Sequence, residues 1–133
     1  MAQYATELFI QCVYSLELSY HELLEKEAAL KSSVTVILEE SGGEFIHFEE
    51  MGDTMRVQCV FAEYGEELFH PVMSRIAPLM DGQVECRALF VHKDLGFIHI
   101  FTVSRGAWQE SCLHLPAPGP LTRALRDQDP PSR

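Results

Sequence analysis

Apolar and polar residues alternate near the start of the chain and then change period. From Leu8 to Leu18, apolar side chains occupy every second position, which is typical of a strand with one buried face. Residues 20–31 are mostly strong helix formers, and Ser19 with Glu22 has the sequence signature of a capping box. The pattern therefore predicts a strand followed by a helix.

The next apolar runs predict a hairpin, and the whole order of elements then recurs. Val34–Leu38 and Phe45–Phe48 flank a glycine turn and are expected to pair. Phe45-Ile46-His47-Phe48 is echoed by Phe97-Ile98-His99-Ile100, and Ile10–Tyr14 by Val57–Phe61. The second copy is expected to have a strand at 55–61, an irregular turn at 66–70, a helix to Leu79, and strands at 84–92 and 97–104.

These elements predict an α+β fold in which tandem βαββ repeats form a mainly antiparallel sheet with two helices on one face. The first repeat covers residues 1–52 and the second covers 53–115, together making one compact domain. Residues 108–115 are expected to add a short strand or a turn. Residues 116–133 contain five prolines and few large apolar groups, which indicates a disordered tail.

Two family resemblances follow from the element order alone. The tandem βαββ order resembles that of gyrase-inhibitor-like ligand-binding domains, which implies a small-molecule cleft between the repeats. Residues 5–31 also fit the apolar stripe of one long helix. That alternative order resembles the acidic, dimeric type III secretion chaperones, and it implies a dimeric chaperone.

The chain is strongly acidic, with 20 acidic and 10 basic residues and a net charge of −10. Residues 1–52 hold half of the acidic residues and only Lys26 and Lys31 as basic ones. Such a chain repels phosphate backbones, so direct nucleic-acid binding is not expected. The expected partner is a basic protein surface or a nucleic-acid-binding protein. The protein itself is expected to be a monomer or a homodimer.

Five glutamates flank the turn and the far end of the first predicted hairpin, and they form the candidate partner-binding face. They are Glu39, Glu40, Glu44, Glu49 and Glu50. Like charges across a hairpin cost stability, so their density suggests a use in binding. The alternative is that they protect a sheet edge from pairing with other chains.

The compartment is predicted to be the cytoplasm. Glu7 precedes any basic residue, which is unlike a signal peptide, and no apolar run approaches the length of a membrane span. The four cysteines occur singly within or near apolar runs, as is typical of reduced core thiols. No contact with a membrane is expected.

No catalytic or cofactor-binding motif is present, so neither an enzyme nor a cofactor is predicted. If the repeats pack about a twofold axis, Cys12, Cys59, His47 and His99 are the residues that converge on a metal, although core packing is the simpler interpretation. The function expected is that of a small acidic, non-enzymatic binding protein. It would occupy a basic surface of another macromolecule, as phage-type inhibitors, immunity proteins and nucleic-acid mimics do.

Overall fold

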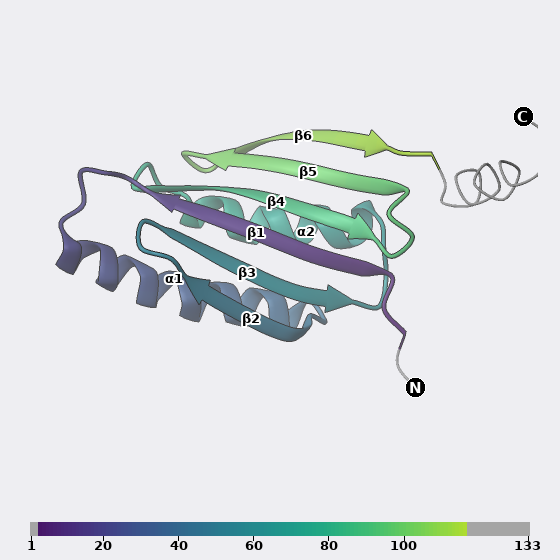
Figure 1. The fold of residues 1–133 in the computed structure, drawn as a ribbon, viewed down its shortest axis with the longest axis horizontal. Coiled ribbons are helices and arrows are strands. Elements are labelled where there is room, and N and C mark those ends of the chain that lie inside the picture. The colour runs from purple at the N-terminus through teal and green to yellow at the C-terminus, as the bar shows by residue number, and fades with distance from the viewer. Residues whose placement is uncertain (1–2, 117–133) are drawn as a thin grey trace, which may run out of the picture.

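A six-stranded antiparallel sheet forms the framework of the fold, and two helices pack on one of its faces (Figure 1). The computed structural model describes residues 3–116. The strands are β1 (Thr6–Tyr14), β2 (Glu44–Glu50), β3 (Thr54–Phe61), β4 (Val84–His92), β5 (Phe97–Ser104) and β6 (Ala107–His114). The helices are α1 (Tyr20–Glu40) and α2 (Glu66–Ile76), and the 3₁₀ turn η1 (Ala77–Leu79) continues α2. The predicted α+β class is therefore confirmed.

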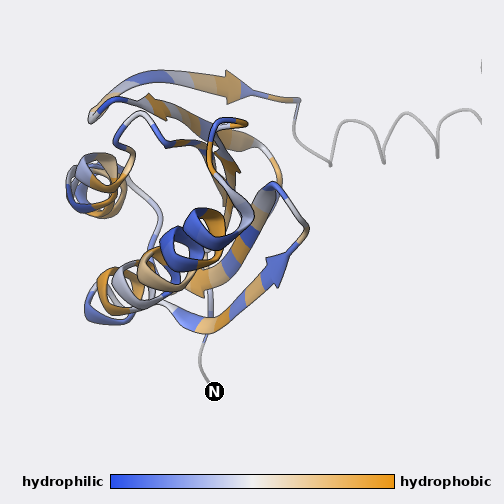
Figure 2. Cartoon of the chain, turned by 90° about the vertical axis from the view of Figure 1, so that its left-hand side faces the viewer, coloured by the Kyte–Doolittle hydropathy of each residue, from blue (hydrophilic) through white to orange (hydrophobic). Residues whose placement is uncertain are grey.

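The strands follow the order β2-β3-β1-β4-β5-β6 across the sheet, so β2 and β6 are its edges. Strands β1 to β4 and the two helices form two interleaved β-α-β units, the split arrangement of ferredoxin-like folds. Strands β5 and β6 extend the sheet beyond β4. Figure 2 shows both helices on the concave side of the curved sheet, which we call the covered face; the other side is the uncovered face.

The central strand β1 confirms the alternating pattern at the start of the chain. Leu8, Ile10, Cys12 and Tyr14 are buried on the covered face, while the residues between them lie on the uncovered face. Because residues 6–14 pair with β3 and β4, the alternative of one long helix over 5–31 is wrong. The chaperone resemblance loses the element order on which it rested.

Helix α1 begins as predicted but continues past Lys31 to Glu40. The backbone N–H of Glu22 donates to the Ser19 hydroxyl at 3.1 Å and the Glu22 carboxylate accepts from the Ser19 N–H at 2.8 Å, so the capping box is confirmed. The strand predicted at Val34–Leu38 is wrong, because these residues form the last turns of α1. Its buried residues follow a helical period and pack under the sheet; they are Leu30, Val34, Ile37 and Leu38. Burial here overrides the strand preference of β-branched residues.

Helix α2 also differs from expectation, since residues 66–70 are helical rather than an irregular turn. Pro71 lies inside the helix, where a proline removes one backbone donor. The helix persists because its buried stripe anchors it to the sheet. That stripe comprises Phe69, Val72, Met73 and Ile76.

The second predicted hairpin is confirmed as β4 and β5, and residues 107–114 form β6. Residues 1–52 contain one strand after their helix, whereas residues 53–115 contain three. His47 and His99, expected at equivalent positions, lie on opposite faces. His47 is paired with Gln58 on the uncovered face, and His99 is paired with the buried Phe90 on the covered face. The predicted disordered tail lies outside the described residues, apart from Pro116.

Candidate functional site

The five predicted partner-binding glutamates lie along one edge of the molecule, which we call the acidic edge. Glu39 and Glu40 end α1, while Glu44, Glu49 and Glu50 belong to the edge strand β2. All five are exposed. The predicted hairpin does not form. The short turn at 41–43 joins the end of α1 to the start of β2, so Glu44 follows Glu39 and Glu40 closely, whereas Glu49 and Glu50 lie at the other end of β2.

Intramolecular contacts occupy several of these carboxylates. Glu40 pairs with Arg75 at 2.8 Å, and Glu50 pairs with Lys31. The hydrogen bond from Lys31 lowers the pKa of Glu50 below its ordinary range. Glu44 accepts a hydrogen bond from the Tyr4 hydroxyl at 2.9 Å. Glu39, Glu44 and Glu49 form no ion pair with a lysine or arginine of residues 3–116, although Glu49 lies 4.0 Å from His47 Nε2 and opposite Arg56 in the β2–β3 pair.

Phe45, for which the sequence pattern indicated no function, is a prominent residue of the acidic edge. Its side chain is 75% exposed, and its φ of 57° is in the left-handed region that phenylalanine rarely adopts. The register between β2 and β3 shifts between Glu44 and His47, which identifies a β-bulge. The ring packs edge-to-face on Tyr4, with 5.8 Å between centroids. Two adjacent apolar residues, Phe45 and Ile46, break the alternation and are the sequence signal of this bulge.

A different set of polar side chains gathers near the opposite edge, between α2 and the covered face of β5 and β6. We call it the histidine–glutamate cluster, and its members are Tyr64, Glu66, His70, His99 and Glu110. Glu110 Oε1 lies 2.9 Å from His70 Nε2, and its Oε2 lies 3.8 Å from His99 Nε2. The Tyr64 hydroxyl lies 3.3 Å from His99 Nδ1. The cluster thus links a loop, a helix and two strands.

Aromatic rings pack against the two histidines of this cluster. The His99 side chain is 16% exposed and its ring lies 4.9 Å from the buried ring of Phe69. His70 stacks on Trp108, with 6.3 Å between centroids. Burial is the main reason that the pKa of Tyr64 is raised to about 12, so its hydroxyl keeps its proton at neutral pH. The cluster is therefore more firmly positioned than the acidic edge.

The four residues considered for a metal do not come together. Cys12 and Cys59 lie on the covered face, His47 lies on the uncovered face, and only His99 belongs to the cluster. Cys12, Cys59 and Cys86 are buried, as is typical of core thiols, whereas Cys112 is exposed. Burial raises the pKa of the Cys59 thiol to about 12, as expected for a core residue.

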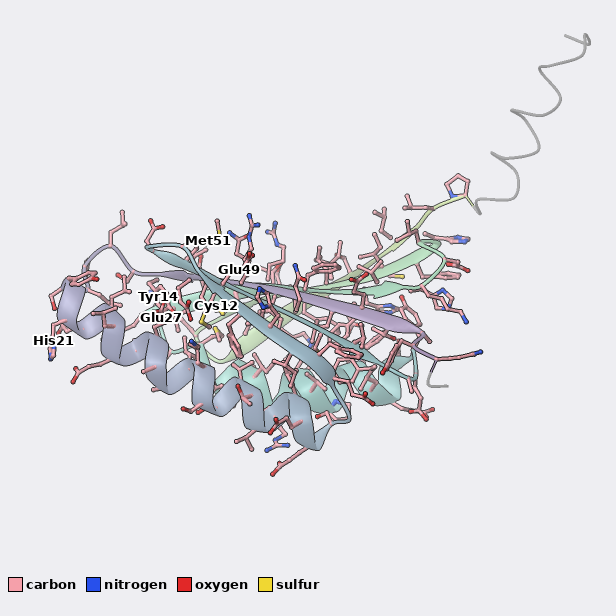
Figure 3. The ribbon with its side chains drawn as sticks, turned by 60° about the horizontal axis from the view of Figure 1, so that its bottom comes forward. Cys12, Tyr14, His21, Glu27, Glu49 and Met51 are labelled. Carbon is pink, nitrogen blue, oxygen red and sulfur yellow. The ribbon has the colours of Figure 1, made fainter. Side chains whose placement is uncertain are left out.

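One further carboxylate lies between α1 and the sheet. Figure 3 shows Glu27 pointing from α1 toward Tyr14 and Cys12, whereas Glu49 lies across the sheet and His21 lies at the start of the helix. Partial burial raises the pKa of Glu27, and the nearby Glu50 raises it further. The Tyr14 hydroxyl donates to the Met55 Sδ at 3.7 Å, so Tyr14 is satisfied within the core.

The uncovered face is hollowed where β3, β1 and β4 run side by side. Arg56 and Arg87 are the cross-strand neighbours of Gln11 on its two sides. Neither arginine forms an ion pair with a carboxylate of residues 3–116. The depression has a volume of about 360 Å³, and its lining includes Phe9, Gln11, Arg56, Gln58, Arg87 and Leu89.

Comparison of the chain with protein-family models and with curated protein sequences found no match. Among residues 3–116, neither helix has the length and apolar character needed to cross a membrane.

Proposed function

We propose that this protein is a non-enzymatic binding protein whose acidic edge occupies a basic surface of another macromolecule. It would act as an inhibitor, an immunity protein or a nucleic-acid mimic does, by covering a surface that is otherwise used. The observation that carries the proposal is Phe45, an exposed aromatic ring held in a strained conformation among carboxylates. Left-handed backbone at a non-glycine residue costs about 1–3 kcal/mol and is concentrated at functional sites.

The combination of ring and charges fits the anatomy of a binding surface. Aromatic side chains are frequent energetic centres of interfaces, and a polar rim surrounds them. Here Phe45 supplies the apolar centre, and Glu39, Glu44 and Glu49 supply charges without a lysine or arginine partner in residues 3–116. Carboxylates steer a basic partner and raise the association rate, while the ring slows dissociation.

The edge position of β2 also favours side-chain recognition over strand addition. An exposed edge strand offers unpaired backbone groups to any neighbouring chain, and bulges and charges are the usual protection. The bulge at Phe45 and the carboxylates of β2 supply both devices. A partner would therefore read the side chains of this edge and not its backbone.

Affinity isolation from a native lysate, with the protein immobilised through its C-terminus, tests the proposal. We expect one basic protein to be retained at low salt and released near 1 M salt, where charges are screened beyond about 3 Å. Phe45→Ser and the pair Glu39→Lys with Glu44→Lys should each weaken retention. Glu17→Lys with Glu25→Lys, which adds the same charges in the turn before α1 and in its first turns, should retain the partner. Equal retention by all variants would rule out the acidic edge as the binding surface.

The depression on the uncovered face favours a second candidate function, binding of a small anionic molecule. The depression lies where strands of residues 1–52 and 53–115 meet, which is where a cleft between the two predicted repeats was expected. Arg56 and Arg87 would hold the anion from opposite sides. A library of carboxylates and phosphates, screened by thermal shift, separates the candidates: ligands of this site lose their effect in Arg56→Gln and Arg87→Gln but keep it in the Glu39→Lys, Glu44→Lys variant.

A further inference from the structure

We infer that Glu66, His99 and Glu110 form a binding site for a divalent transition-metal ion, a function separate from that of the acidic edge. One ligand atom from each of these residues lies within 4.8 Å of those of the other two. The three come from α2, β5 and β6, so folding alone brings them together. The combination of one imidazole and two carboxylates suits borderline ions such as Zn²⁺.

The orientation of His99 supports the assignment. The Tyr64 oxygen lies 3.3 Å from His99 Nδ1, on the side of the ring away from Glu110. With Nδ1–H donating to that oxygen, the lone pair of Nε2 faces the two carboxylates and is available to a metal. Metal-binding histidines are usually fixed in this way by a partner on their other nitrogen.

Glu110 is oriented by a similar device. Its Oε1 lies 2.9 Å from His70 Nε2, whereas its Oε2 faces His99. One oxygen is therefore held by a histidine and the other is left for a metal. The stack of His70 on Trp108 restricts this partner in turn. Carboxylates that bind metals are commonly hydrogen-bonded through the second oxygen in the same manner.

The charge of the site also favours a cation. Neither Glu66 nor Glu110 forms an ion pair with any lysine or arginine among residues 3–116. Glu67, next to Glu66 in the first turn of α2, adds a third carboxylate nearby. A bound divalent ion would neutralise negative charge that the protein itself leaves uncompensated.

Only a small adjustment is needed for binding. Ligands at the usual zinc distances of about 2.0–2.2 Å lie about 3.4 Å from one another in a tetrahedron. Glu66 is exposed at the start of α2, so its side chain is free to make most of the approach. Three protein ligands leave the fourth position of a tetrahedral zinc open to water, as in catalytic and not structural zinc sites.

Calorimetric titration of Zn²⁺ into full-length, tag-free protein stripped with a chelator tests the site. We expect one equivalent to bind. Glu66→Gln, Glu110→Gln and His99→Gln should each weaken binding by about 100-fold or more, and Tyr64→Phe by about 10-fold to 100-fold, the usual loss for an outer partner. Glu66→Gln is the cleanest variant because its side chain is exposed and makes no contact in the buried core.

Two matched controls should leave the affinity unchanged. His21→Gln removes an exposed histidine that faces Glu25 on α1, an ordinary surface pair. Cys112→Ser removes the exposed thiol opposite His99 on β6. The assignment is overturned if no stoichiometric binding occurs, if Glu66→Gln and Glu110→Gln bind as tightly as the natural chain, or if binding depends on Cys112 or His21 instead.

Discussion

The two edges of the sheet carry opposite kinds of polar surface. The acidic edge at β2 is built from residues 39–50, which are close in sequence, and its side chains are exposed and loosely paired. The histidine–glutamate cluster beside β6 draws on residues 64–110, and all of its side chains except the exposed Glu66 are held by hydrogen bonds or aromatic contacts. The acidic edge presents exposed charge, whereas in the cluster Tyr64, His70, His99 and Glu110 are positioned by one another and by the rings beneath them.

This difference separates two physical requirements. Steering a partner needs net charge at a surface but little positional accuracy, because Coulomb forces between exposed groups act over about a Debye length. Holding an ion needs ligand atoms fixed within a few tenths of an ångström, which only a rigid support provides. The acidic edge meets the first requirement, and the cluster, supported by the core, approaches the second.

The largest effect should come from removing that support. Phe69 is fully buried and its ring lies 4.8 Å from that of Tyr64, 4.3 Å from Phe90 and 4.9 Å from His99. Phe69→Ala should lower the free energy of unfolding by about 3–5 kcal/mol, through lost burial and a cavity. Urea denaturation followed by circular dichroism measures this. A loss below about 1 kcal/mol would show that the cluster does not depend on the core beneath it.

The second prediction is that the two edges contribute to the pH dependence of the free energy of unfolding in different pH ranges. The folded state raises the pKa of Tyr64 from 10.0 to about 12, chiefly by burial. The corresponding stabilisation is complete below pH 10 and is lost as pH rises toward 12. At the acidic edge, Lys31 lowers the pKa of Glu50 below 4.5, so that contribution is present above this pH and is lost on acidification.

Unfolding free energies measured from pH 9 to 12 should therefore fall more steeply for the natural chain than for Tyr64→Phe. The Lys31→Met variant, which removes the partner of Glu50, should change the acid limb. Parallel alkaline curves for the natural chain and Tyr64→Phe would contradict the assignment of this limb to Tyr64.

Much of the fold was predictable from local patterns. The alternation in β1, the capping box of Ser19 and the hairpin of β4 and β5 are all encoded within short segments, and all are present. The error at Val34–Leu38 arose because β-branched residues favour strands, whereas Leu30, Val34 and Ile37 also satisfy a helical period. Only the packing of α1 against the sheet decides between a strand and a helix for these residues.

The candidate sites were predictable to different degrees. The acidic edge was visible in the sequence because its charges form a local run, although Phe45 was missed with the bulge that exposes it. The cluster could not be predicted from the sequence. An irregular turn was expected at residues 66–70, whereas Glu66 and His70 lie one turn apart in the helix α2. Pairing of β5 with β6, which brings Glu110 to His99, is likewise a property of the folded sheet.

The third prediction concerns the strained residue of the acidic edge. Left-handed backbone costs a non-glycine residue about 1–3 kcal/mol, and glycine escapes this cost but loses more entropy on folding. Phe45→Gly should therefore raise the free energy of unfolding by at most about 1 kcal/mol, whereas the β-branched Phe45→Val should lower it by about 1 kcal/mol. Thermal denaturation of the two variants measures the difference. Equal stabilities would mean that the backbone at this bulge is not strained.

The smallest effect on stability is expected from the charges themselves. Glu39 and Glu44 form no ion pair with a lysine or arginine of residues 3–116, and Glu44 loses only an exposed hydrogen bond from Tyr4. Glu39→Lys with Glu44→Lys should change the free energy of unfolding by no more than about 0.5 kcal/mol, with a slight gain from relieved repulsion. Association with the partner retained from lysate should nevertheless slow, and its salt dependence should flatten. Stopped-flow mixing at two salt concentrations, beside urea denaturation, measures both quantities. A loss of stability above about 2 kcal/mol would make these carboxylates part of the structural framework. The acidic edge would then differ from the cluster less than the geometry indicates.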